Sequence, residues 1–346
     1  MKEKIKQLIR YHHIKRLYEK YERVLMPATL VFGVVADSIT FTSINIWLSF
    51  ILLGAYFFIA GGAIIYIHAF DARHIPERNT MRYLRLIAPL VIQFTFGALL
   101  SGSFVFYLFS GSIFVSWPFI GALAALMVSN DVFRKYYLRP VVQIGVYYFI
   151  LFSVISIILP FWLEDISESI FVGGGLASLV VIFVYGRLAA RVSPEIRSRR
   201  RSIALAVIAI FVFLNSLYFA NAIPPLPLSL RESIVSHGIQ RKGGSYILQV
   251  EKEKFLDRLT PGTIVHKMQG ERIAVYTAIF APGKLKTKIV HHWQEYDALT
   301  KKWMTRDRLP FLISGGRSDG FRGYSIKSAV GAGEWRVDVE TERGQV

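Results

Sequence analysis

The chain has 346 residues, 53% of them hydrophobic, with a net charge of +17 at pH 7 and a mean hydropathy of +0.40, which indicates a membrane protein. It contains no cysteine, so disulfides, thiolate nucleophiles and cysteine-based zinc or iron–sulfur sites are excluded. Nearly all of the hydrophobicity lies before about Ser229, and the residues from Leu230 onward alternate apolar and polar. The sequence therefore predicts one membrane domain followed by one aqueous domain.

Residues 1–24 form a basic segment without an apolar run like the core of a signal peptide. Its apolar residues fall near helical spacing, with lysines and arginines between them. We expect a basic amphipathic helix on the anionic inner surface of the membrane. The alternative is a solvated tail that only orients insertion.

Apolar segments after residue 24 are long enough for seven membrane-spanning helices. A helix needs about 20 apolar residues to cross the hydrocarbon core. Residues 24–68 contain no lysine or arginine over about twice that length, so we divide them into two helices joined by a tight turn. The predicted spans are 25–42, 45–68, 84–109, 112–130, 140–162, 169–190 and 203–221.

The placement of positive charge predicts the orientation of these spans. With a cytoplasmic N-terminus, the inside segments 1–24, 71–85, 131–140 and 187–201 carry 8, 4, 3 and 6 lysines or arginines. The three short outside loops carry none. By the positive-inside rule the N-terminus is cytoplasmic, and seven spans place the C-terminal domain outside.

The predicted spans contain few polar residues. Ion-coupled carriers and lipid-processing enzymes need ionisable groups in the bilayer, and no proton-relay pattern is present. The uncharged polar residues that could line a path are Gln93, Gln143 and Asn215. Small residues, including the pairs Gly121/Ala125 and Gly173/Ala177, favour close helix packing over a glycine-lined substrate path.

A proline-rich linker is predicted over 222–244, because the prolines of NAIPPLPLSL end the last helix and favour an extended segment. From 245 to 346, short alternating segments recur with turn residues between them, at 245–251, 262–268, 272–283, 285–297, 301–305, 309–316, 321–328 and 334–344. Seven or eight strands in about a hundred residues predict an all-β domain, either an immunoglobulin-like sandwich or a small barrel.

Three runs in this domain, HHWQEYDALTKKW, ISGGRSDGFRGYS and GEWRVDVETERGQ, resemble the C-terminal module of bacterial membrane proteins grouped as domain of unknown function 2914. The resemblance covers about the last sixty residues, and the IPPLPLSL junction is similar to full-length members. It implies a bacterial inner-membrane protein with a periplasmic module. It implies no catalytic residue, substrate or cofactor.

The histidines and tryptophans of this domain are assigned mostly to its core. His291 and His292 are neighbours in a predicted strand, so they point to opposite faces and cannot chelate one ion together. We expect His291 to be a hydrogen-bonded core residue and His292 to lie on the surface. His237 and His266 are isolated in the sequence, so no metal site is predicted.

Alternation also predicts which tryptophans are buried. Trp335 alternates with Val337 and Val339, which predicts a core position, and Trp293 is expected to be buried as well. Trp303 follows two lysines near a turn, where its ring is either packed or available for stacking on a sugar.

The stretch SGGRSDGFRGYS at 314–325 is rich in glycine and arginine. It lacks the residue order of a Walker loop, and its Asp-Gly pair is typical of a tight hairpin turn. The alternative is an anion site, because guanidinium groups bind phosphate and carboxylate. The candidate ligand-binding residues are Arg317, Arg322, Tyr324, Arg306, Arg308 and Trp303.

Binding rather than catalysis is the predicted function. No nucleophile elbow or H-E-x-x-H motif occurs in the C-terminal domain, so neither catalytic residues nor cofactors are expected. From residue 231 the chain has 20 lysines or arginines against 13 acidic residues, which favours anionic lipid head groups or glycans. We expect an envelope component or a partner protein as ligand, with the helices as an anchor, assembly or transmission element. No nucleic-acid partner is expected, and a homo-oligomer is left open.

Two other functions remain as alternatives. One is a transporter or scramblase of an amphipathic envelope precursor, which requires a water-filled cavity lined by the polar residues of the spans. The other, less expected, is a membrane enzyme that acts on lipid-linked glycans, which requires converging acidic or histidine residues at the outer membrane surface.

Overall fold

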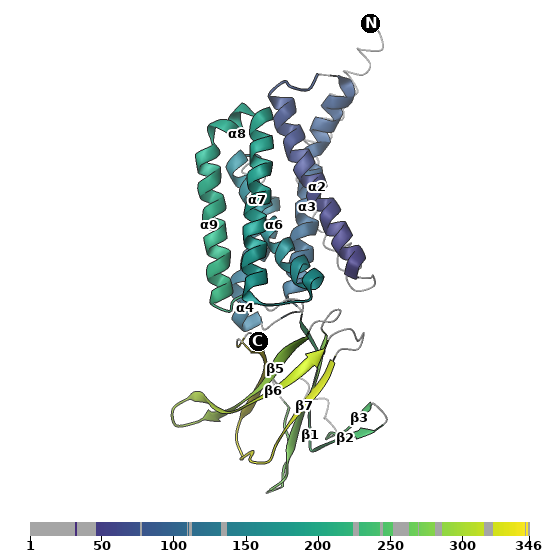
Figure 1. Cartoon of the computed structure of the whole chain (residues 1–346), viewed down its shortest axis with the longest axis vertical. Helices are drawn as coiled ribbons and strands as arrows, with labels where there is room; N and C mark the ends of the chain where they lie inside the picture. The colour runs from purple at the N-terminus through teal and green to yellow at the C-terminus, as the bar shows by residue number, and fades with distance from the viewer. Residues whose placement is uncertain are drawn as a thin grey trace. The chain divides into compact units, whose positions relative to one another are not determined.

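The structure is a computed structural model. It describes residue 32 and the ranges 46–76, 78–108, 110, 113–132, 137–223, 228–242, 245–251, 263–268, 270–280, 286–314, 321–342 and 344. The chain divides into two compact units, one mainly helical and ending at Ile223, the other β-rich and made mostly of residues after Ile223. Figure 1 shows the elements of each unit.

The helical unit contains seven described helices, six of which correspond to predicted spans. They are α2 (Ile46–Asp71), α3 (Asn79–Leu108), α4 (Ile113–Val132), α6 (Pro140–Leu163), α7 (Glu168–Val192), α8 (Pro194–Ser198) and α9 (Arg200–Phe219). Of these, α2, α3, α6, α7 and α9 are long and apolar enough to cross a membrane, and α4 is shorter in its apolar part. The first predicted span, 25–42, and the basic segment 1–24 lie almost wholly outside the described residues. The chain is a membrane protein.

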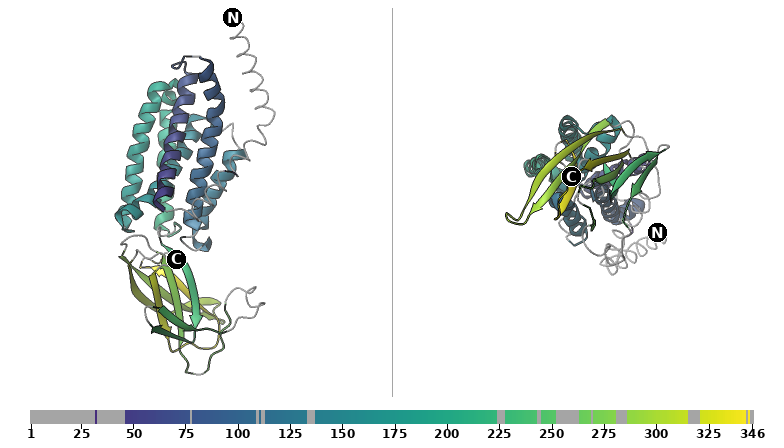
Figure 2. Two further views of the ribbon diagram at one scale, coloured as in Figure 1. Left: turned by 90° about the vertical axis from the view of Figure 1, so that its right-hand side faces the viewer. Right: turned by 90° about the horizontal axis from the view of Figure 1, so that it is seen from below.

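The helices run alongside one another in both side views (Figures 1 and 2), and α6 is the most enclosed. In α6, 83% of the apolar stretch is buried, compared with 22% in α9. Burial on this scale is reached because Tyr147 and Tyr148 of α6 pack against neighbouring helices. The outward face of α9 is apolar as well, as expected where lipid replaces protein neighbours.

Close helix contacts involve glycines other than the predicted pairs. Nothing lies within 4 Å of an added Cβ at Gly121 or Gly173 in the described structure. At Gly174 an added Cβ would lie 3.2 Å from Ile155, and at Gly175 it would lie 3.0 Å from Phe152. The prediction of tight packing through the pairs at 121/125 and 173/177 is therefore wrong, because a four-residue spacing does not tell which helix face meets a neighbour.

The β-rich unit is built from antiparallel strands. They are β1 (Ser229–Ser236), β2 (Gly238–Lys242), β3 (Ser245–Gln249), β4 (Ile273–Phe280), β5 (Lys286–Asp297), β6 (Lys302–Ser314), β7 (Phe321–Lys327) and β8 (Trp335–Thr341). One sheet has the order β1-β4-β7, the second has the order β6-β5-β8, and β2-β3 is a separate hairpin. Strands β1 and β2 occupy much of the predicted linker 222–244, so the β fold begins earlier than expected.

The two three-stranded sheets share a core, as a sandwich requires. Ile279 of β4 packs with Ile289 of β5 and Ile313 of β6, and Val275 of β4 packs with Trp293 of β5. Inward-facing residues of β4, β5 and β6 thus come together through the period-2 alternation of each strand.

His291 is a core residue, as predicted. Its Nε2 lies 3.0 Å from Thr277 Oγ1, and its Nδ1 lies 2.7 Å from Ser325 Oγ, which also accepts a hydrogen bond from Trp293 Nε1. Burial lowers the pKa of His291 to about 4, so the imidazole is neutral at pH 7. The histidine therefore hydrogen-bonds β5 to β4 and β7 of the opposite sheet.

Candidate ligand-binding cleft

A cleft of about 880 Å³ opens between the two sheets of the β-rich unit. Its apolar wall comes from strands of both sheets, because β1 and β4 contribute from one side and β5 and β8 from the other. The wall consists of Val235, Ile273, Val275, Trp293, Trp335 and Val337. The core is thus continuous with an apolar space of the size that ligand pockets have, roughly 300–1,000 Å³.

Most of the remaining wall is formed by described residues outside the strands, from 263–268 and Gly270 before β4 and from 328–333 before β8. Residues 262–268 are predicted as a strand, but the described part of this segment, 263–268, is not one. Lys267 is the one charged side chain among the described residues that line the cleft. Its Nζ donates to Val330 O at 2.6 Å, so it joins the two segments.

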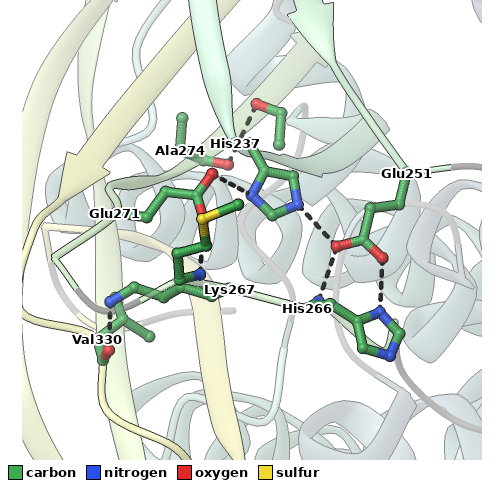
Figure 3. A network of polar contacts seen from close by, with 9 residues as sticks. His237, Glu251, His266, Lys267, Glu271, Ala274 and Val330 are labelled. Atoms are coloured by element: carbon green, nitrogen blue, oxygen red, sulfur yellow. Dashed lines mark hydrogen bonds and ion pairs between the residues drawn. The ribbon is translucent and has the colours of Figure 1, made fainter.

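Four ionisable residues hold the first of these segments in place (Figure 3). His237, between β1 and β2, lies between two carboxylates: Nε2 is 2.7 Å from Glu251 Oε1, and Nδ1 is 2.9 Å from Glu271 Oε1. Glu251 also accepts from the backbone N–H of His266 at 2.7 Å and lies 2.8 Å from its Nδ1. Glu271 accepts from the N–H of Met268 at 2.9 Å.

We call His237, Glu251, His266 and Glu271 the carboxylate–histidine latch. The residues whose backbone it binds are the two neighbours of Lys267, so the latch sets the position of the charged group in the cleft. Hydrogen bonding to Glu251 is the main cause that raises the pKa of His237. Bonds from His266 and then from His237 lower the pKa of Glu251 to about 2, and the bond from the Met268 N–H lowers that of Glu271.

Because of the latch, we expect the protection of the backbone amides of residues 263–268 against hydrogen exchange to depend on pH. The contribution of His237 to the stability of the latched segment is complete below its unfolded pKa of 6.5. This contribution is lost as pH rises through the raised pKa of the folded state. The contribution of Glu251 is complete above 4.5 and is lost as pH falls towards about 2. Amide hydrogen exchange of this segment, corrected for intrinsic rates, should therefore be slowest between about pH 4.5 and 6.5. In a His237→Gln variant, the rise in exchange above about pH 6.5 should disappear. Identical pH profiles in the variant and the unchanged protein would contradict the role of His237 in the latch.

The predicted ligand-binding residues are divided between the two sheets. Trp303, Arg306 and Arg308 lie on β6, where Arg306 Nε is 2.7 Å from Glu295 Oε2 and Arg308 is 2.7 Å from Glu340 Oε2. The Trp303 ring faces the guanidinium of Arg336, 5.0 Å from the ring centroid. Both arginines of β6 are thus already paired with carboxylates of the same sheet, and the tryptophan is half-exposed with a cation over it.

The other members of that set lie elsewhere. Arg322 and Tyr324 are on β7 in the opposite sheet, and the Tyr324 ring is 5.8 Å from that of Tyr246 on β3. Arg317 lies outside the described residues. The structure brings none of the described β7 residues of this set into the cleft, and their role in binding stays a prediction.

Two of the three polar residues of the spans come together, and the third does not. Gln93 and Gln143 border a cavity of about 20 Å³ with Asn130, and Gln143 Oε1 lies 2.9 Å from His68 Nε2. Asn215 instead donates to Phe211 O of its own helix at 2.8 Å. A cavity of this size has room for about one water molecule, and the role of these residues in a substrate path stays a prediction.

His292 differs from its prediction as a surface residue. It is 9% exposed, with Nδ1 2.7 Å from Glu340 Oε1 and Nε2 2.8 Å from Thr305 Oγ1. Alternation places it correctly on the face opposite His291. That face is covered at His292, however, because Thr305 of β6 and Glu340 of β8, on the two neighbouring strands, contact its ring.

A helical membrane unit joined to an antiparallel β unit with an apolar cleft defines a multi-pass membrane protein with a C-terminal β-domain. Residues 286–346 of that domain match the family described as "Protein of unknown function (DUF2914)". No curated protein and no solved structure matches the chain. The matching part contains β5 to β8, and therefore Trp293, Trp335 and Val337 of the cleft, whereas the latch precedes it.

Proposed function

We propose that this protein is a bacterial inner-membrane protein whose C-terminal β-domain lies in the periplasm and binds an amphipathic envelope molecule with an anionic head group. The apolar chain of the ligand occupies the cleft, and the head group meets Lys267. The membrane helices serve as anchor and assembly element. The observation that carries the proposal is the apolar cleft of about 880 Å³ with a single lysine among its described lining residues.

The chemistry of the cleft supports an amphipathic ligand. Trp335 and Val337 present partly exposed apolar side chains to the cleft, above the buried ring of Trp293. Burial of apolar area contributes about 25 cal/mol per Å². Lys267 is partly buried, so a charge-assisted bond to phosphate or carboxylate is stronger there than at an exposed site. The surplus of lysine and arginine from residue 231 onward also favours an anionic ligand.

The periplasmic location is supported by the distribution of charge. The 21 lysines and arginines of the four inside segments stand against none in the three short outside loops. Five described helices are long and apolar enough to span the membrane, α4 provides a shorter sixth, and the sequence supplies a seventh at 25–42. An odd number of spans puts the two ends of the chain on opposite sides.

The competing functions receive less support. For a transporter or scramblase, the polar cavity at Gln93 and Gln143 is too small for an amphipathic molecule. For a glycan ligand, the half-exposed Trp303 offers a stacking surface, but Arg336 lies over its ring. A partner protein in place of a lipid remains the second candidate ligand of the β-domain.

The binding experiment uses the full chain in phosphatidylcholine nanodiscs and a dansyl-labelled undecanoic acid as probe. Val337→Trp fills the cleft and should weaken binding at least about tenfold, the equivalent of about 1.4 kcal/mol. Lys267→Gln should weaken binding of the acid by about tenfold while leaving the matching dansyl-labelled alcohol unaffected.

Leu312→Trp is the matched control, because Leu312 is 61% exposed and lies outside the cleft. It introduces the same ring and gives the same partitioning of the probe into the nanodisc. Equal binding by Val337→Trp and Leu312→Trp would refute the cleft as the binding site. If Lys267→Gln weakened binding of the acid and of the alcohol equally, the proposed role of the Lys267 charge would be refuted.

A further inference from the structure

A second cluster of polar residues lies on the outer face of the sheet β6-β5-β8, away from the cleft wall. It contains His292 of β5 with Asp338 and Glu340 of β8, and one ligand atom from each residue lies within 4.8 Å of the others. We propose that these three side chains bind a divalent transition-metal ion, with zinc the best match. This proposal is independent of the ligand proposed for the cleft.

Strand register explains why these residues meet. His292 is directly opposite Asp338, and Val290 is opposite Glu340, in the antiparallel pair β5–β8. Side chains two residues apart on one strand share a face, so Asp338 and Glu340 lie on the face that carries His292. Two backbones held by ladder hydrogen bonds thus fix all three donor groups on rigid elements.

The donor atoms are of the kind that zinc binds. An imidazole nitrogen and two carboxylate oxygens give three protein ligands, which leave a fourth tetrahedral position for water or another ligand. His292 Nδ1 and Glu340 Oε1 are 2.7 Å apart, so a proton lies between them without a metal. A metal ion replaces that proton, so binding releases protons and weakens as pH falls.

The atoms that face away from the proposed ion already have partners. Thr305 Oγ1 lies 2.8 Å from His292 Nε2, and Arg308 donates to Glu340 Oε2 at 2.7 Å. Such contacts orient metal ligands, because the second ring nitrogen and the second carboxylate oxygen of a ligand are normally hydrogen-bonded. The amide nitrogen of Gln294 lies 3.0 Å from His292 Nδ1 and 3.3 Å from Asp338 Oδ2, so this side chain has to turn away when an ion binds.

Charge balance limits the expected affinity. Arg308 pairs with Glu340 and Arg336 with Asp338, so the two carboxylates are neutralised before an ion arrives. Burial nevertheless raises the pKa of Asp338, and the nearby charge of Glu340 raises it further, although Arg336 opposes this effect. We therefore expect weaker binding than in a closed structural zinc site with four protein ligands.

The test titrates the full chain, carrying no histidine tag, with Co²⁺ and with Zn²⁺ after treatment with a chelator. Co²⁺ should produce visible d–d absorption, Zn²⁺ should displace it, and Zn²⁺ in excess should raise the unfolding temperature of the β-domain. Glu340→Gln and His292→Gln should each weaken Zn²⁺ binding by at least about tenfold. Asp338→Asn, at the most exposed ligand, should have the same effect with the least disturbance of folding.

His266→Ala is the control, because it removes an exposed histidine that contacts a carboxylate in the latch. It should bind Zn²⁺ as the unchanged protein does. The proposal is overturned if no Co²⁺ spectrum appears, if Asp338→Asn binds Zn²⁺ normally while folded, or if His266→Ala abolishes binding. The last outcome would assign the ion to the latch.

Discussion

Replacing Trp293 with alanine is expected to lower the free energy of unfolding of the β-domain by about 3–5 kcal/mol. Trp293 is 2% exposed and packs with Ile273 and Val275 in the core below the cleft. The substitution removes this apolar contact, leaves a large cavity and deprives Ser325 Oγ of the hydrogen bond from the indole N–H. Because the same ring forms part of the cleft wall, binding of the dansyl-labelled acid should weaken as well.

The measurement is pulse proteolysis of the full chain in a urea series, with the β-domain followed by its C-terminal fragments. Trp303→Ala is the matched control, because its ring is 37% exposed and lies outside the two core clusters. Trp303→Ala should lower the free energy of unfolding of the β-domain by no more than about 1 kcal/mol. If the two alanine variants unfold at the same urea concentration, Trp293 is not the centre of the core.

Replacing Gly61 with leucine is expected to destabilise the helical unit by about 1–3 kcal/mol or more. A Cβ at this position in α2 would overlap the hydroxyl of Tyr147 on α6 and come within 3.3 Å of Tyr185 on α7. The hydroxyl of Tyr185 donates to Gly61 O at 3.0 Å, and Tyr147 stacks on Phe57 with 4.4 Å between ring centroids. Neither ring can move without breaking these contacts.

Gly62→Leu provides the control for this helix position. An added Cβ at Gly62 has nothing within 4 Å in the described structure, and the residue is exposed. Both variants add the same side chain to adjacent residues of α2, so helix propensity and hydropathy change equally. Thermal unfolding in nanodiscs should show a lower midpoint for Gly61→Leu alone. A similar loss in both variants would indicate an effect on α2 itself instead of on its packing.

Most of the architecture is predictable from the sequence, because it depends on short-range patterns. Continuous apolar runs predicted the six described helices that match spans, and alternation predicted β4, β5, β7 and β8 within a few residues. The same alternation placed His291 and Trp293 on the inward face of β5, where the structure has them. The extent of β6 was less predictable, because this strand joins the two predicted strands 301–305 and 309–316 across residues 306–308.

The functional groups depended on contacts between residues far apart in the chain. His237 meets Glu251 and Glu271, which come 14 and 34 positions later, and no local spacing distinguishes these acids from others. The glycine–arginine stretch was conspicuous in the sequence, yet its described Arg322 lies on the opposite sheet from Arg306 and Arg308. Motif density in the sequence therefore did not predict which of the described arginines lie on the same sheet.

By itself the sequence determined that the protein has an apolar helical part and a β-rich part, because backbone hydrogen bonding in lipid and the two-residue period of strands constrain local composition. Only the tertiary structure decided that two sheets leave an apolar cleft, that Lys267 lines it, and that His292 is covered by Glu340. Alternation along a strand specifies a face of the sheet. Which strand lies next to it, and in which register, is decided by packing and ladder hydrogen bonds over the whole domain.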